Sequence, residues 1–305
     1  MLISHVRTTS KGGVAHRNTH PLVRELFGAH CHDVSVCQGD HALLTIVLKR
    51  GIPRYVTVMV SREDYKDSID KFVGIIEREL ADKVVAVYAA GSFARGDYIV
   101  GRSDIDLYIV VKEEEEGLKK KLYEICKEIE DKNLKEVKNY HPEPLSLAIT
   151  TMDEVKDGKS WLGMGWEYHI FLREGRLLYG TDIKEFIQRP SRENEILLAR
   201  RVLEDFKSGH EIYRLFSLVF RTTSIFLSLS AIYVAAKEDV VKEFKKAYPN
   251  EKDAVKALER AYELWNLWAK RELTDEEVLE VFNAALKMSN TISRLLKMEE
   301  TGVHT

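Results

Sequence analysis

The sequence lacks several features that would assign it to a large protein class. Its 305 residues include 3 cysteines, a small, odd number that argues against a disulfide-stabilised scaffold and is typical of a reducing compartment. The net charge is −3, so no overall basic field would attract nucleic acid, although a local basic patch stays open. We therefore expect a cytoplasmic protein.

Long apolar segments are also missing. His5, Arg7 and Lys11 interrupt the N-terminal region, which argues against a signal peptide. The least polar long stretch, residues 215–236, contains Arg221 and several serines and threonines, so we predict a buried helix there and not a membrane span. No membrane partner is expected.

Three common catalytic motifs are absent. The chain has no Gly-x-x-x-x-Gly-Lys-[Ser/Thr] loop, no Gly-x-Gly-x-x-Gly turn and no Gly-x-Ser-x-Gly elbow. These absences argue against P-loop, Rossmann and α/β-hydrolase chemistry.

The composition is that of a folded protein. Hydrophobic residues make up 45% of the chain, enough for a substantial core. Charged residues make up 31% of the chain, more than the usual quarter. Proteins from thermophiles are often enriched in charged residues in this way.

The most informative stretch is residues 84–111. Residues 84–90 form an apolar run rich in β-branched side chains, which predicts a buried strand. Gly91-Ser92 and a short polar loop follow, and residues 104–109 then alternate strictly between polar and apolar. Because side chains alternate faces along a strand, Asp104 and Asp106 are expected on one face, about 6.6 Å apart along the chain.

This arrangement predicts a metal and phosphate site. Two carboxylates on one strand face repel each other unless a cation lies between them, and Mg²⁺ prefers such oxygen ligands. A glycine lets a phosphate approach the backbone at Gly91. The Ser92 hydroxyl and the free N–H groups of the short helix that follows can hold phosphate oxygens. The alternative without a bound metal or phosphate is a glycine-rich turn and a solvated Asp pair on a sheet edge.

These residues resemble the DNA polymerase β-like nucleotidyltransferase superfamily. Its signature is a Gly-Ser turn followed, roughly ten to a dozen residues later, by Asp-hydrophobic-Asp on the next strand, here Gly91-Ser92 and Asp104-Ile105-Asp106. The resemblance implies Mg²⁺ held by Asp104 and Asp106. It also implies a nucleoside triphosphate gripped by Gly91 and Ser92, with donors added by Arg95, Arg102 and Ser103.

One residue departs from the family pattern. The superfamily has a third carboxylate on a later strand, where it completes the second metal site and can deprotonate the acceptor hydroxyl. The matching position here is Ser146, which cannot serve as a carboxylate. We select Glu143, just before that strand, as the candidate base.

The C-terminal part carries a second resemblance. It looks like the helical domain of aminoglycoside adenylyltransferases, with Arg221, Lys237, Pro249 and Tyr262 as counterparts of family positions. The resemblance implies that Lys237 and Tyr262 hold the nucleotide. An ordinary surface lysine and a core tyrosine are the alternative.

The remaining segments are assigned by periodicity and breakers. We predict a loose arm over residues 1–20, followed by short strands up to residue 60, and the histidines and cysteines there form either a zinc site or solvated side chains. We also predict helices at 61–80 and 118–129 and strands at 134–140 and 145–150. Residues 152–156 are predicted as a short helix or turn, and residues 161–169 as a mixed core and loop segment. Thr274 and Glu277 are predicted to form a capping box.

The sequence therefore predicts an α/β (α+β) nucleotidyltransferase core with a mixed sheet and a C-terminal all-α helical bundle. The expected divisions are an N-terminal arm and β-rich segment (1–60), a nucleotidyltransferase domain (61–185) and a helical domain (186–305). The expected reaction moves a nucleoside monophosphate, AMP from ATP, to an unknown hydroxyl acceptor with release of pyrophosphate and with Mg²⁺ as cofactor. The alternatives are a degenerate nucleotide- or RNA-binding regulatory module and a toxin–antitoxin component.

Overall fold

The computed structural model describes residues 60–163, 165–204 and 211–300. The chain divides into two units, Met1–Arg54 and Tyr55–Thr305, and the described residues belong to the second. The expected arm, short strands and zinc site before residue 60 lie outside the described residues.

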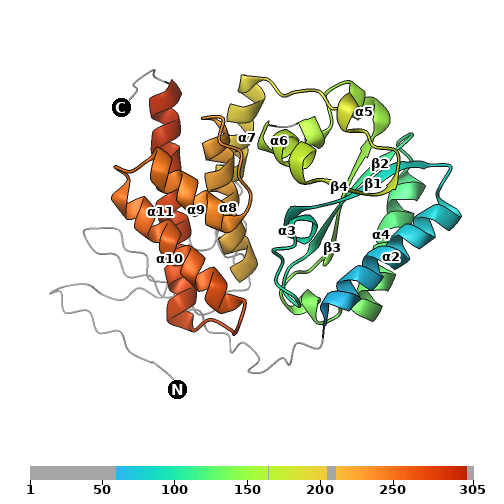
Figure 1. Cartoon of the computed structure of the whole chain (residues 1–305), viewed down its shortest axis with the longest axis horizontal. Helices are drawn as coiled ribbons and strands as arrows, with labels where there is room; N and C mark the ends of the chain where they lie inside the picture. The colour runs from blue at the N-terminus through green and yellow to red at the C-terminus, as the bar shows by residue number, and fades with distance from the viewer. Residues whose placement is uncertain (1–59, 164, 205–210, 301–305) are drawn as a thin grey trace, which may run out of the picture. The chain divides into compact units, whose positions relative to one another are not determined.

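A four-stranded mixed sheet forms the centre of the α/β part (Figure 1). Its strands are β1 (Val84–Ala90), β2 (Ile105–Val111), β3 (Leu145–Thr151) and β4 (Arg176–Gly180), in the order β3-β2-β1-β4. Strand β1 runs antiparallel to β2 and β4, whereas β2 and β3 are parallel. The prediction of a mixed sheet is confirmed.

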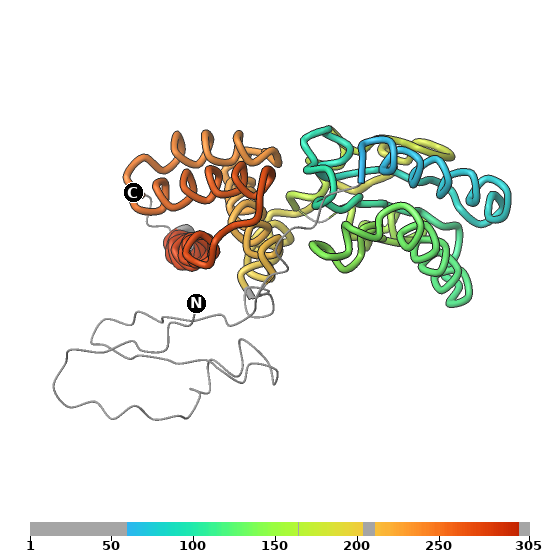
Figure 2. The backbone as a smooth tube through the Cα atoms, turned by 90° about the horizontal axis from the view of Figure 1, so that it is seen from below, coloured from blue at the N-terminus to red at the C-terminus, as the bar shows by residue number. Residues whose placement is uncertain are grey.

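Two long helices cover one face of this sheet. Helices α2 (Arg62–Glu79) and α4 (Glu116–Asn133) lie side by side there (Figures 1 and 2). A capping box between Ser61 and Asp64 starts α2, as the sequence predicts from Ser61. The apolar residues of β2 (Ile105, Leu107 and Ile109) pack into the core under these helices.

The other face carries shorter elements. The core on this face includes residues of α5 (Met152–Lys156), the 3-10 turn η2 (Trp161–Gly163) and α6 (Gly165–Glu174). It also includes Ile183 and Ile187, which flank the 3-10 turn η3 (Lys184–Phe186). Because Ile105 and Leu107 point to the α2/α4 face, Asp106 between them points to this one. The fold thus directs the acidic side chain of β2 towards α6 and the helices that follow.

The C-terminal part is helical, as predicted. Its elements among the described residues are α7 (Arg192–Glu204), α8 (Ile212–Ser228), α9 (Lys237–Ala247), α10 (Lys252–Trp268) and α11 (Asp275–Glu300). They share their own apolar core, and Figure 2 views α11 nearly end-on beside α9 and α10. The predicted capping box at the start of α11 is present, with Glu277 N donating to Thr274 Oγ1 at 3.3 Å. None of the described helices is both long and apolar enough to cross a bilayer.

Three segments differ from the sequence predictions. Residues 134–140, predicted as a strand, follow the end of α4 at Asn133 and contain the 3-10 turn η1 (Val137–Asn139). Local hydrogen bonds such as Val137 N to Leu134 O occupy the backbone groups that a strand would need. The helix predicted over 215–236 ends at Ser228, before a turn in which Ala231 adopts a φ of 57°. The segment 161–169 contains the start of α6.

Candidate active site

A cavity of about 410 Å³ lies between the sheet and the helical part. This volume is within the range of small-molecule sites. Its lining comes from the short helix α3 (Gly91–Arg95), the ends of β1, β2 and β3, one side of α6, and one side of α8, α9 and α10. The lining residues include Gly91, Ser92, Asp104, Asp106, Ser146, Glu167, Glu174, Arg221, Lys237, Trp265 and Trp268.

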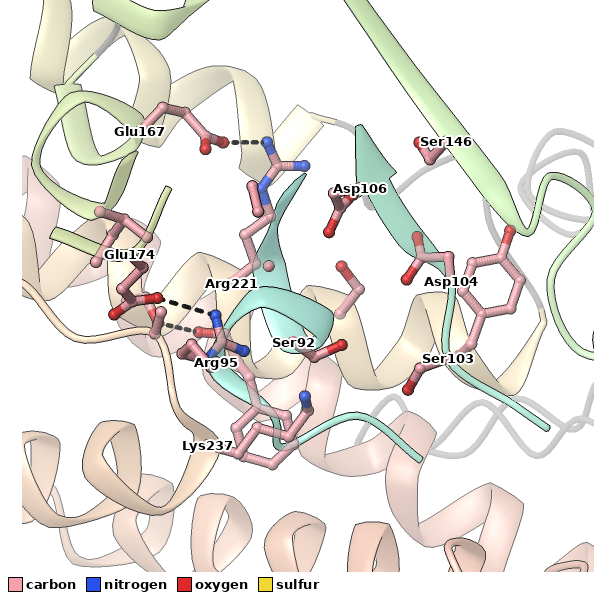
Figure 3. A pocket seen from close by; sticks show the side chains of 18 of the residues that line it. Ser92, Arg95, Ser103, Asp104, Asp106, Ser146, Glu167, Glu174, Arg221 and Lys237 are labelled. Carbon is pink, nitrogen blue, oxygen red and sulfur yellow. Dashed lines mark hydrogen bonds and ion pairs between the residues drawn. The ribbon is translucent and has the colours of Figure 1, made fainter. Parts of the chain in front are cut away.

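The two aspartates and the Gly-Ser turn meet at this cavity (Figure 3). In the sheet, Asp106 is paired on one side with Ala90, the last residue of β1, and on the other with Ser146 of β3. The register therefore puts the Gly-Ser turn, the acidic pair and Ser146 next to one another. Ser146 lies beside Asp106, as the sequence alternation predicts.

Gly91 is required at its position for two reasons. Its φ of 62° lies in the left-handed region, which side chains rarely adopt. A Cβ there would also lie 3.1 Å from Asp106 Cγ and would overlap a carboxylate oxygen. The glycine thus allows Asp106 to stand directly against the turn.

The acidic pair fits a hard divalent cation. Burial raises the pKa of Asp106, and the charges of Asp104 and Glu167 raise it further, so an ionised Asp106 needs a compensating positive charge. The described residues contain no cluster of three or more metal-ligating side chains. Mg²⁺ commonly takes one or two carboxylates and completes its shell with phosphate oxygens and water, so the two aspartates are a sufficient protein contribution.

His141 contacts the first aspartate and was missed by the sequence analysis. Its Nε2 lies 3.1 Å from Asp104 Oδ2, its Nδ1 lies 3.0 Å from the carbonyl oxygen of Glu143, and its ring packs 4.4 Å from Tyr213 of α8. Burial lowers the pKa of His141, but the hydrogen bond to Asp104 and that carboxylate's charge outweigh burial and raise it overall.

Two arginines in the cavity are each held by a glutamate of α6. Arg95 Nη1 lies 3.1 Å from Glu174 Oε2, and Arg221 Nη2 of α8 lies 2.7 Å from Glu167 Oε1 (Figure 3). Neither Glu167 nor Glu174 was predicted from the sequence as a site residue. Their spacing of seven residues would have put them on one helix face, but the segment was not expected to be helical throughout.

Lys237 begins α9 and reaches the cavity from the helical part. Its Nζ lies 3.8 Å from the centre of the Trp265 ring, a cation–π contact. Burial lowers the pKa of Lys237 to about 8, against the attraction of Asp97. The structure therefore brings this lysine together with Gly91, Ser92 and Arg95 on the cavity wall.

The other sequence-selected residues divide into two pairs. Arg102 and Ser103 line the cavity, and the Ser103 hydroxyl accepts a hydrogen bond from Ile99 N at 2.9 Å. Tyr262 of α10 packs against the helical core, and Glu143 is exposed. Neither is among the described residues that line the cavity, and their assigned roles stay predictions.

Comparison with known proteins identifies the α/β part. Residues 69–157 match the family model described as the nucleotidyltransferase domain, which spans the Gly-Ser turn, both aspartates and Ser146. The chain therefore contains a nucleotidyltransferase domain, as the sequence resemblance implies. No curated protein matches the chain.

One similar solved structure is spectinomycin adenyltransferase AAD(9) from Enterococcus faecialis, with ATP and spectinomycin. The identity is 17% and the TM-score 0.49, over 75% of this chain and 99% of that one.

Proposed function

We propose that the protein is a Mg²⁺-dependent nucleotidyltransferase that moves a nucleoside monophosphate from a nucleoside triphosphate to a hydroxyl group and releases pyrophosphate. One observation carries the proposal: Gly91-Ser92 and the Asp104/Asp106 pair come from neighbouring strands of a nucleotidyltransferase domain and line one cavity. ATP is the proposed donor because the C-terminal sequence resembles aminoglycoside adenylyltransferases.

The residues divide into metal ligands and phosphate ligands. Asp104 and Asp106 would hold Mg²⁺, which neutralises the charge that develops on the phosphates during transfer. Ser92 and the cations Arg95 and Lys237 would hold the phosphate tail, because all three line the cavity and offer hydroxyl, guanidinium and ammonium donors.

The transfer itself is an in-line displacement. The acceptor oxygen forms a bond to the α-phosphorus while the bond from that phosphorus to the bridging oxygen breaks, and pyrophosphate leaves with the electron pair. The hydroxyl proton goes to a base. We assign this role to Glu143, because Ser146 cannot take a proton near neutral pH and Glu143 is the nearest carboxylate on the chain leading into β3.

The test is a transfer assay. The full-length protein is incubated with Mg²⁺, each α-labelled nucleoside triphosphate and cell extract, and the labelled product is isolated. We expect one triphosphate to label a discrete acceptor in a metal-dependent manner. Failure of every triphosphate to label any species, with pyrophosphate release also absent, would reject the proposal.

A second candidate is a nucleotide-binding module without catalysis. It is favoured by one observation: the residue paired with Asp106 on β3 is Ser146 and not a carboxylate. Such a module would bind a non-hydrolysable ATP analogue but release no pyrophosphate with any acceptor. Activity created by Ser146→Asp in an inactive wild type would support this candidate.

A further inference from the structure

Two buried hydrogen-bond donors in the cavity wall have no partner among the described residues. They are Arg102 Nη1 and Trp268 Nε1, on residues that are 6% and 1% exposed, and both residues line the cavity. A buried donor left unpaired costs about 1–3 kcal/mol. An oxygen-bearing ligand would remove this cost at both positions.

The Arg102 guanidinium is held firmly on its other side. Its Nη2 lies 2.9 Å from Glu272 Oε1, and the Tyr140 hydroxyl donates to the same oxygen at 2.8 Å. The guanidinium carbon lies 4.6 Å from the centre of the Tyr140 ring and 5.1 Å from that of Trp268. Arg102 and Trp268 are therefore neighbours, and Nη1 is the guanidinium nitrogen that has no partner in the described part of the chain.

The sheet order indicates which substrate meets these donors. The sequence of strands β1, β2 and β3 puts the Asp pair between the Gly-Ser turn and the segment that leads into β3. Arg102 packs on Tyr140 of that segment. In an in-line displacement the nucleophile enters opposite the leaving group. With the leaving phosphates at Ser92, the acceptor is on the β3 side.

We propose that Arg102 Nη1 and Trp268 Nε1 form a subsite for an oxyanion of the acceptor, which is therefore a small hydroxyl compound bearing a carboxylate or phosphate group. A guanidinium is always charged and matches both groups in geometry. The compensating charge of Glu272 is shared with solvent, because its side chain is 34% exposed. A cationic amine at Nη1 and Nε1 would meet two hydrogen-bond donors and the positive charge of the guanidinium. The assignment to the acceptor rests on the proposed transfer reaction.

The experiment uses four probes on one three-carbon scaffold: glycerol 3-phosphate, glycerate, glycerol and 3-amino-1,2-propanediol. Binding to the full-length protein is measured by calorimetry without nucleotide, so it does not depend on catalysis. We expect at least one anionic probe to bind, and the neutral and cationic ones to bind at least roughly tenfold more weakly, as for loss of a hydrogen bond to a charged group. Comparing the affinities of glycerol 3-phosphate and glycerate shows whether the subsite prefers a phosphate or a carboxylate.

Two variants test the donors. Trp268→Phe keeps an aromatic ring and removes the N–H donor. Arg102→Lys keeps the positive charge and removes the planar guanidinium with its paired N–H donors. Each should weaken anionic-probe binding roughly tenfold. Trp268→Phe should leave affinity for a non-hydrolysable ATP analogue unchanged. Arg102→Lys is judged on probe binding alone, because the sequence resemblance also gives Arg102 a role at the triphosphate. Trp161→Phe is the matched control, because Trp161 Nε1 is also buried without a partner among the described residues, but Trp161 is not one of those that line the cavity.

Three outcomes would overturn the inference: no preference for the anionic probes, unchanged binding by a folded Trp268→Phe protein, or equal weakening of the ATP analogue. The last would assign the donors to the nucleotide. Absence of transferase activity together with Trp268-dependent anion binding would reject the proposed reaction and leave the oxyanion subsite standing.

Discussion

The backbone of Gly91 lies so close to Asp106 that no side chain fits between them: a Cβ on Gly91 would be 3.1 Å from Asp106 Cγ. Gly91 directly follows β1 and Asp106 belongs to β2, yet the two residues are packed as a unit. The turn that is proposed to grip phosphate and the carboxylate that is proposed to hold the metal thus depend on each other's position.

The first prediction follows from this contact. Gly91→Ala should displace Asp106 and impose strain of about 1–2 kcal/mol at a left-handed residue, so both the melting temperature and the transfer rate should fall. Gly74→Ala is the control, because Gly74 has an unobstructed Cβ position within α2 and a helical glycine replaced by alanine gains about 0.5–1 kcal/mol. Equal effects of the two variants in thermal unfolding and transfer assays would contradict the packing argument.

The second prediction concerns the aspartates. Asp104→Asn and Asp106→Asn should each reduce Mg²⁺-dependent transfer by about 100-fold or more, since a metal ligand supplies several kcal/mol of charge stabilisation. Burial raises the pKa of Asp106, which means that its charged form opposes folding at neutral pH, so Asp106→Asn should keep or increase the melting temperature. The exposed Asp153, replaced by Asn, serves as the control. Near-normal transfer by either site variant would show the metal assignment to be wrong.

The third prediction is a proton uptake linked to Lys237. Burial lowers the pKa of Lys237 in the free protein to about 8, and bound phosphate should raise it. Below pH 8 the lysine is already protonated and binding takes up no proton there. Above pH 8 the free protein has lost that proton, so ATP binding should take one up and affinity should decrease as pH rises.

Calorimetry at pH 7 and pH 9, in buffers of different ionisation enthalpy, measures this uptake. Lys237→Arg should bind the ATP analogue without proton uptake at either pH, because arginine stays protonated. Uptake that persists in this variant would assign the titrating group to another residue.

The fourth prediction concerns the proposed base. Glu143→Gln should reduce turnover by roughly 10²–10⁴-fold, the usual contribution of general-base catalysis, with unchanged affinity for the ATP analogue. Glu136→Gln, earlier in the same connection, is the control. If the two variants transfer nucleotide at the same rate, Glu143 is not the base, which would agree with its exposed position.

Local patterns in the sequence determined most of the α/β part. The apolar run before Gly91 is β1, the alternation around Asp106 is β2, and Ser61 caps α2 as expected. These features depend on residues that are neighbours along the chain. Successive side chains of a strand point to opposite faces of the sheet, and a capping residue forms its hydrogen bond within the first helical turn. For the same reason the sequence could place both aspartates and Ser146 on one face.

The tertiary structure decided which side chains from distant segments contact each other. His141 beside Asp104, Glu167 on Arg221, and Arg102 between Tyr140 and Trp268 each bring together residues from different elements. Residues 134–140 are a different case, because local turn bonds after the end of α4 override their β-like composition. Side-chain pairing across elements depends on how helices and sheet pack, and no periodicity along the chain records that packing.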